Sequence, residues 1–256
     1  MPSNSKNNYI AFQTFLAIEL SMEPTTANEY KTRLITGIVV AFLLVPIAGR
    51  LALDGHGYDT HYVLFSRYFY WLEVAVLLCY ARWIEKGPFF IWPPQKQKFW
   101  FYPASFGALY LLAIAAGAVS NIPKLFGIPD NREVMEQMLH VVNKSMPLMI
   151  FGVVTAGVTE ELIFRAYMVP RLELIFKNKY MPVIISALLF SALHFRYLSV
   201  DELLFTFLLG IVFAIHYQWY RNISILIITH AIIDFISFVL LGWVEAYKIS
   251  HHIIQR

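Results

Sequence analysis

Two adjacent carboxylates and an arginine lie in an otherwise apolar stretch of this chain. Glu160 and Glu161 follow a run of small and apolar residues, and Arg165 comes four residues after Glu161. A charged side chain at the centre of a bilayer costs roughly 2.5–3.5 kcal/mol on insertion scales. Such residues must therefore be paired, face a water-filled cavity, or carry a function.

The spacing of these three residues separates the two carboxylates. Positions four apart share one face of a helix, so Glu161 and Arg165 can form an ion pair. Glu160 lies about 100° around the helix from Glu161. The two carboxylates therefore need not do the same work.

Two histidine motifs follow on later apolar stretches. His194 comes four residues after Phe190, and His230 comes four residues before Asp234. His230 and Asp234 can point at one site, since they share a helical face. A carboxylate or a histidine can take a proton from water, and suitable donors stabilise the oxyanion of a tetrahedral intermediate. Three apolar segments thus carry side chains of the kind that hydrolysis needs.

The composition indicates an integral membrane protein. Of the 256 residues, 58% are hydrophobic and 14% are charged, whereas a soluble domain has about 25% charged residues. The net charge of +3 is small and the basic residues form no cluster, so no nucleic-acid partner is expected. The single cysteine, Cys79, rules out an intramolecular disulfide and a cysteine-based metal site.

Seven stretches are long and apolar enough to span a bilayer. An apolar patch at 9–20 is interpreted as an interfacial helix and would make an eighth span if it crossed. Because lipid offers the backbone no hydrogen-bond partners, all spans should be helical. We expect an all-α, polytopic membrane helix bundle with about 7–8 transmembrane helices. The seven stretches are 34–53, 63–84, 102–120, 146–164, 181–194, 203–220 and 223–243.

The chain is expected to form one domain with four segments. A short surface helix is predicted at 132–142, and the tight turn at 220–222 predicts an antiparallel hairpin of the last two spans. The segments are an N-terminal segment at 1–33, transmembrane helices with a polar loop at 34–145, a catalytic transmembrane core at 146–243, and a C-terminal tail at 244–256.

The order of these motifs resembles the CPBP family of intramembrane glutamate proteases, which includes the CAAX-prenyl endopeptidases and the bacterial Abi proteins. The resemblance covers roughly residues 152–237. Each motif alone is weakly specific, but the three together, in this order and on successive apolar segments, are quite specific. The residues that carry the resemblance are Glu160, Glu161, Arg165, Phe190, His194, His230 and Asp234.

The resemblance implies a catalytic role for four of these residues. Glu160 would be the general base that activates water, and His194 would help to hold that water. His230 and Asp234 would shape the oxyanion side of the site. The chain departs from the CAAX endopeptidases, which carry Asn where this chain has Asp234. An ionised Asp cannot donate a hydrogen bond, so its expected role is to orient His230.

The other three residues are expected to support the site. The resemblance implies that Glu161 and Arg165 form a structural or substrate-binding pair, in which Arg165 would hold a substrate carboxylate. Phe190 is expected to pack within its motif. Arg67 and Glu73, in the second span, are interpreted as snorkelling or paired rather than as part of the site.

Two other classes of function remain open from the sequence. The same acids and histidines are acceptable ligands for zinc or another divalent metal, so a metal-dependent membrane hydrolase is one alternative. Against it, the chain lacks the His-x-x-x-His spacing of zincins. A non-catalytic membrane partner or a transport protein is the other alternative, since intramembrane acids and histidines also form proton relays.

The preferred hypothesis is an intramembrane endopeptidase that needs no cofactor. Its partners would be the lipid bilayer and a peptide or protein substrate, with or without a lipid group. The resemblance and Asp234 favour a bacterial Abi-type member in the cytoplasmic membrane. The sequence identifies neither the physiological substrate nor the oligomeric state.

Overall fold

A computed structural model describes residues 24–53 and 58–254, and within these ranges all regular structure is helical. The predicted interfacial patch at 9–20 lies outside the described residues. The elements are α2 (Pro24–Leu53), α3 (Thr60–Trp83), α4 (Phe101–Ser120), α5 (Ile122–Leu125), α6 (Glu133–Val142), α7 (Met146–Glu160), η1 (Glu161–Met168), α8 (Val169–Phe176), α9 (Tyr180–Leu193), η2 (His194–Tyr197), α10 (Val200–Tyr220) and α11 (Ile223–Ile254).

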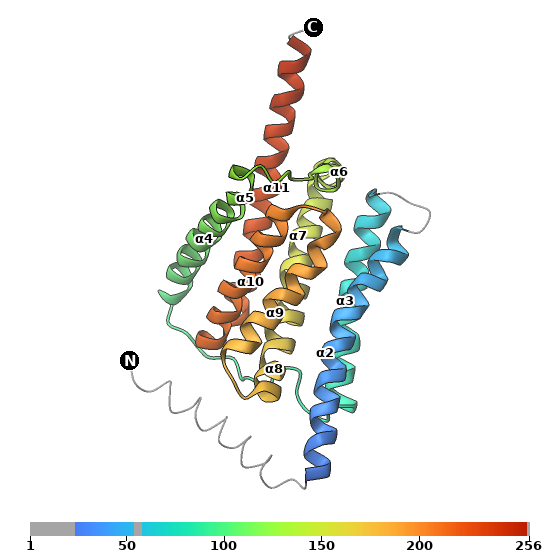
Figure 1. Ribbon diagram of the computed structural model, residues 1–256, viewed down its shortest axis with the longest axis vertical. Helices are drawn as coiled ribbons and strands as arrows, with labels where there is room; N and C mark the ends of the chain where they lie inside the picture. The colour runs from blue at the N-terminus through green and yellow to red at the C-terminus, as the bar shows by residue number, and fades with distance from the viewer. Residues whose placement is uncertain (1–23, 54–57, 255–256) are drawn as a thin grey trace.

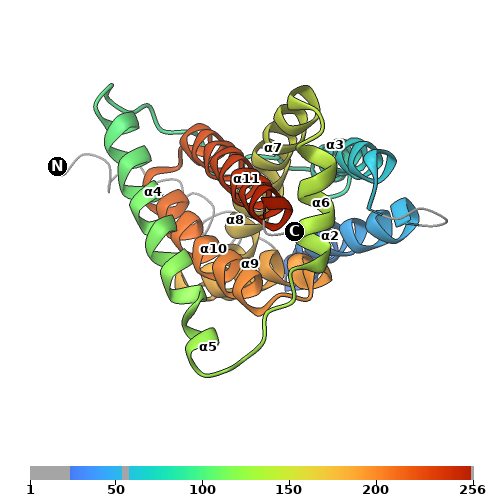
Figure 2. The ribbon, with the colours of Figure 1, turned by 90° about the horizontal axis from the view of Figure 1, so that it is seen from above.

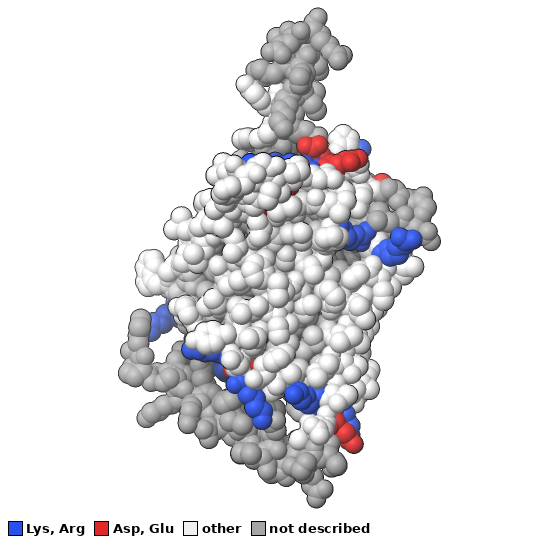
Figure 3. Space-filling model, viewed as in Figure 1, with Lys and Arg blue, Asp and Glu red and all other residues white. Residues whose placement is uncertain are grey.

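Seven helical stretches in the described chain are long and apolar enough to cross a membrane. They correspond one to one with the seven predicted spans, so the all-α polytopic bundle is confirmed. Figure 3 shows a broad uncharged belt on one face, with charged side chains mostly gathered toward its two ends. This is the pattern expected where a surface meets lipid in the middle and water at both ends.

The helices form a bundle whose two flanks differ. α2 and α3 pack together on one flank, and α4 lies on the other flank against α10 (Figures 1 and 2). α7 packs between them, against α3 on one side and α11 on the other. The continuous helix α7–η1–α8 is the most enclosed of the seven spans, so its polar residues have protein rather than lipid around them.

The fourth span is longer than predicted. Its expected end at 164 was wrong, because the helix continues through two arginines to Phe176. Both arginines are almost completely buried, with Arg165 1% and Arg171 0% exposed, and each is paired with a glutamate. Paired charges can remain inside a membrane protein, so these charges do not end the span.

The middle of this helix, η1, is π-helical. Its hydrogen bonds reach five residues back, as the bond from the Val169 N–H to the Phe164 carbonyl shows. Ser186 of α9 also donates to that carbonyl at 3.1 Å. Such π-helical turns inside α-helices are frequent at functional sites, and this one begins at Glu161.

A glycine allows α7 and α11 to approach closely. A Cβ atom on Gly157 would lie 3.0 Å from the Ile227 carbonyl and 3.1 Å from the Ala231 backbone nitrogen. Small residues at helix crossings let membrane helices pack backbone to backbone. Because Gly157 and Ala231 neighbour the carboxylate pair and His230 along their helices, this crossing brings the two motifs together.

The predicted helix at 132–142 and the tight turn at 220–222 are both present, but the last two helices do not pack together as a hairpin. The surface helix is α6, and the connection between α10 and α11 comprises only Arg221 and Asn222. Arg221 adopts the left-handed conformation, with φ of 46°, which ends α10 abruptly. α11 then packs mainly on α7 rather than on α10, so the hairpin partners separate after the turn.

Candidate active site

A cavity of about 260 Å³ lies among α3, α4, α6, α7, α9, α10 and α11. Its lining combines apolar side chains with a few acids, histidines and one arginine, as is usual for a ligand site. Four predicted catalytic residues from three separate helical segments line it together. They are Glu160, His194, His230 and Asp234.

Glu160 presents its carboxylate to this cavity while remaining 6% exposed. Arg67 Nη1 lies 3.9 Å from one carboxylate oxygen, and His230 Nε2 lies 3.9 Å from the other. Both distances exceed hydrogen-bond range. Glu160 therefore has positive or polar neighbours on two sides but is not engaged by either.

Glu161 points elsewhere and is fully enclosed. Its Oε1 atom accepts a hydrogen bond from Arg165 Nη1 at 2.8 Å and lies 2.8 Å from His230 Nδ1. Glu161 is 0% exposed and does not line the cavity. The different surroundings expected for the two carboxylates are therefore observed.

Arg165 is held between Glu161 and two aromatic rings. Its guanidinium carbon lies 4.4 Å from the centre of the Phe190 ring and 5.4 Å from that of Phe213. Arginine binds favourably over aromatic faces. Because Arg165 is 1% exposed, a substrate cannot reach it in this structure, and the observed contacts favour the structural over the substrate-binding alternative.

The orientation of His230 differs from the expectation. Glu161 engages Nδ1, whereas Asp234 lies 3.6 Å from Nε2, too far for a hydrogen bond. A carboxylate can only accept, so Nδ1 carries the proton in this contact when Glu161 is ionised. His230 Nε2 consequently faces the cavity, between Glu160 and Asp234.

His194 begins the short η2 helix, where α9 ends. Its Nδ1 atom lies 3.0 Å from the Phe190 carbonyl. A carbonyl can only accept a hydrogen bond, so Nδ1 is the donor and Nε2 is left as an acceptor in the neutral ring. The centre of the Phe190 ring lies 5.0 Å from that of His194 and 6.2 Å from that of His230, so one phenylalanine packs against both histidines.

The sequence interpretation missed Arg67. It was placed outside the site, but it lines the same cavity and is the cation nearest to Glu160 among the described residues. Trp71, one turn further along α3, donates to Thr155 of α7 at 3.2 Å and helps to fix this helix pair. The sequence did contain a signal for Arg67, because an arginine inside an apolar span by itself points to function.

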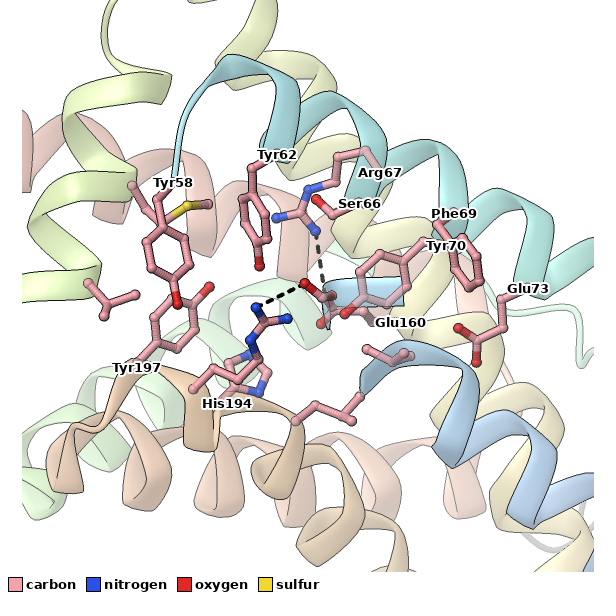
Figure 4. A pocket seen from close by; sticks show the side chains of 16 residues that line it. Tyr58, Tyr62, Ser66, Arg67, Phe69, Tyr70, Glu73, Glu160, His194 and Tyr197 are labelled. Atoms are coloured by element: carbon pink, nitrogen blue, oxygen red, sulfur yellow. Dashed lines mark hydrogen bonds and ion pairs between the residues drawn. The ribbon is translucent and has the colours of Figure 1, made fainter. Parts of the chain in front are cut away.

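A second, smaller cavity adjoins the first one on the α2 and α3 side. Figure 4 shows it, with Tyr70 between Glu160 and Glu73, and Tyr58 and Tyr197 at the other end. Arg67, Glu160, His194 and Tyr197 line both cavities, together with Met138. The central carboxylate is thus accessible from two sides.

Another buried histidine, His216, lies outside this site. Its Nε2 atom lies 3.1 Å from Ser105 Oγ, and the residue lines neither cavity. In residues 24–53 and 58–254, no three His, Cys, Asp or Glu side chains are grouped so that they could hold a metal ion.

The comparisons with known proteins identify the region that contains this site. Residues 142–236 match the family model described as type II CAAX prenyl endopeptidase Rce1-like. This confirms the resemblance drawn from the motifs, and all seven predicted site residues lie within the matched region. No curated protein and no solved structure matches the chain.

The family match and the fold together indicate the broad class of the protein. The matched family is one of endopeptidases, and the seven apolar helices make the chain an integral, multi-pass membrane protein. The matched region thus resembles membrane endopeptidases, and it lies within a multi-pass helix bundle.

Proposed function

We propose that this protein hydrolyses peptide bonds within the membrane by means of Glu160 and without a cofactor. The observation that carries the proposal is that the adjacent carboxylates of Glu160 and Glu161 have different surroundings. Arg165 and His230 both engage Oε1 of the enclosed Glu161, whereas the Glu160 carboxylate faces two cavities with no hydrogen-bond partner among the described side chains. A general base must be free in this way to receive a proton.

The first step activates water. Glu160 takes a proton from a water molecule that His194 Nε2 helps to orient, and the water oxygen attacks the carbonyl carbon of the scissile bond. The carbonyl oxygen becomes the oxyanion of a tetrahedral intermediate. In the second step, Glu160 returns its proton to the amide nitrogen, the C–N bond breaks, and an amine and a carboxylic acid leave.

The second element of the proposal is stabilisation of the oxyanion. His230 Nε2 and the Arg67 guanidinium flank Glu160 on different helices, each 3.9 Å from it. Either donor could reach an oxygen placed over the Glu160 carboxylate. Preorganised donors of this kind contribute more in a water-poor site than in solution. With both ring nitrogens protonated, His230 donates from Nδ1 to Glu161 and has Nε2 free to donate to the oxyanion.

Glu161 and Arg165 are positioning residues in this proposal. Glu161 holds the His230 ring through Nδ1, and Arg165 holds Glu161 while packing on Phe190. Neither touches the cavity. The substrate carboxylate that the sequence assigned to Arg165 would instead meet Arg67, which lines both cavities.

The finer identity of the protein is also part of the proposal. An Abi-type member of the family in a bacterial cytoplasmic membrane would meet peptides or small proteins, with or without a lipid group. Such a substrate would enter the larger cavity, whose lining is mostly apolar.

The experiment is cleavage of fluorogenic peptides, some of them lipidated, by the purified protein in liposomes. Wild type and Glu160→Gln are compared, each with and without a chelator. We expect cleavage by the wild type that the chelator leaves unchanged and that falls by about 10²–10⁴-fold in the variant. Full activity of Glu160→Gln would overturn the proposal, and loss of wild-type activity with the chelator would favour the metal-dependent alternative.

A further inference from the structure

Glu73 is a buried carboxylate for which the described residues provide no partner. It lies near the middle of α3, is 1% exposed, and neither of its oxygens has a hydrogen-bond partner in this part of the chain. An unsatisfied buried polar group costs about 1–3 kcal/mol, and more if charged. Native structures satisfy such groups with protein or with ordered water.

The space beside Glu73 suits water. The carboxylate lines the smaller cavity, whose volume is about 70 Å³. A buried water needs roughly 10–15 Å³ of such volume and two to four polar partners. Arg67, Ser66 and the hydroxyls of Tyr62 and Tyr70 line the same cavity, and Arg67 Nε also lacks a partner in the described chain. The cavity can therefore hold several hydrogen-bonded waters.

The position of this cavity relates it to the reaction. Glu160 and His194 lie in the walls of both cavities, and Figure 4 places Glu160 and Glu73 on either side of Tyr70. A substrate in the larger cavity would fill the space through which water could otherwise reach Glu160. Each hydrolysis consumes one water, so a separate source is required while the substrate remains bound.

We propose that the smaller cavity is a water chamber that supplies the hydrolytic water to Glu160 from the side opposite the substrate, and that Glu73 is the positioning residue that keeps it hydrated. This inference rests on the proposed function of Glu160. Its ligand is water alone. Glu73 takes no proton in the reaction and touches no reacting atom, so its contribution is to keep the chamber occupied.

The test compares two substitutions of similar size at one position. Glu73→Gln keeps polar atoms in the chamber, whereas Glu73→Leu makes this end of it apolar. We expect Glu73→Leu to lower kcat by about tenfold with KM unchanged, and Glu73→Gln to remain within about threefold of the wild type. Leu72→Val, at a neighbouring position whose side chain is 55% exposed, serves as the control.

Thermal unfolding separates this role from a structural one. Glu73 makes no hydrogen bond to a described protein group, so Glu73→Leu breaks none and should lower activity without lowering the unfolding temperature. A purely structural residue would show lower stability together with lower activity. Wild-type kcat in Glu73→Leu would overturn the inference and leave the proposed function of Glu160 intact.

A readout that needs no activity completes the test. Hydroxyl radicals generated from bound water by X-rays label the side chains next to that water. We expect labelling of Tyr70 and Met138 in the wild type and in Glu73→Gln, and reduced labelling in Glu73→Leu. Equal labelling in all three proteins would overturn the inference. Retained activity of Glu160→Gln, by contrast, would overturn the proposed function and not the hydrated chamber.

Discussion

Ion pairs at two depths join the α3 region to the helix α7–η1–α8, and they differ in almost every respect. Just beyond the end of α3, Glu85 meets Arg171 through contacts of 2.5 to 3.0 Å. In the first half of α3, Arg67 approaches Glu160 no closer than 3.9 Å. Both pairs are largely buried, yet only the second lines the two cavities described above.

The first pair is fully satisfied. Arg171 also donates to the carbonyls of Phe89 and Tyr167, its guanidinium lies 3.6 Å from the Tyr167 ring centre, and the Tyr167 hydroxyl donates to Glu85 at 2.8 Å. Nothing in this network is free to bind a further group. It fixes the loop after α3 to α8, which is a structural task.

In the second pair, between Arg67 and Glu160, some hydrogen-bonding groups have no partner among the described residues. Glu160 has no hydrogen bond from a described side chain, and Arg67 has a buried nitrogen without a partner in the same part of the chain. Under the proposed function the two buried pairs have different tasks, so burial of charge alone does not mark the site. The informative property is a buried charge whose hydrogen-bonding capacity is left open toward a cavity.

The largest expected effects come from removing one carboxylate of each pair. Glu160→Gln should lower single-turnover cleavage by about 10²–10⁴-fold while stability changes by less than about 1 kcal/mol. Glu85→Gln should cost about 3–5 kcal/mol of stability, because Arg171 is left buried and unpaired, while the folded fraction keeps its activity. Unfolding in detergent and cleavage kinetics measure the two quantities. The comparison fails if both variants lose cleavage activity alone, or if both lose stability alone.

A smaller effect is expected at Glu161, which we expect to contribute both to cleavage activity and to stability. Glu161→Gln should lower cleavage by about 100-fold, because His230 loses its fixed orientation. It should also destabilise the protein by leaving Arg165 unpaired. The double variant Glu161→Gln with Arg165→Met should recover stability but not activity. Recovery of both would show that Glu161 acts only through stability.

The close crossing of α7 and α11 gives the next effect. Gly157→Ala must push α11 away from α7, at a cost of about 1–3 kcal/mol, and should lower activity by displacing His230. Gly107→Ala is the matched control, since its new methyl group meets nothing within 4 Å. The control should gain up to about 1 kcal/mol from better helix propensity. Equal behaviour of the two variants would rule out the crossing as a determinant of the site.

The smallest effect is expected for an ion pair at the water-exposed end. The Arg132 side chain is 50% exposed and contacts Asp130 and Asp201 at 2.9 and 3.0 Å. Arg132→Gln should change stability by less than about 1 kcal/mol, because water and salt screen such pairs, and should leave cleavage unchanged. A large loss of activity in the peptide assay would extend the functional region to this end.

The sequence predicted what depends on spacing within one segment. Seven apolar stretches predicted the seven candidate membrane spans of the described chain, and the interval from Glu161 to Arg165 predicted an ion pair that the structure contains. The contacts that were missed join residues far apart in the chain. Glu161 lies 69 positions from His230 and replaces Asp234 as its hydrogen-bond partner. Arg67 reaches Glu160 from another helix, and no local pattern records such an approach.

The π-helical turn also escaped prediction, since its periodicity differs little from that of an α-helix over eight residues. The same is true of the end of the fourth span. Arg165 and Arg171 would be costly in lipid, and only their partners on other segments make them acceptable. Sequence rules that treat each residue alone must stop the span too early at such positions.

The π-helical turn has a consequence for how this helix tolerates changes in length. Closing hydrogen bonds five residues apart accommodates one residue more than an α-helical turn would hold. Deleting one residue within η1 would let the helix close regularly while the rest of the span keeps its angular register. The same deletion within α7 would rotate one part of the helix against the other by about 100° and turn Glu160 from its cavities. A one-residue deletion should therefore be tolerated within η1 but not within α7.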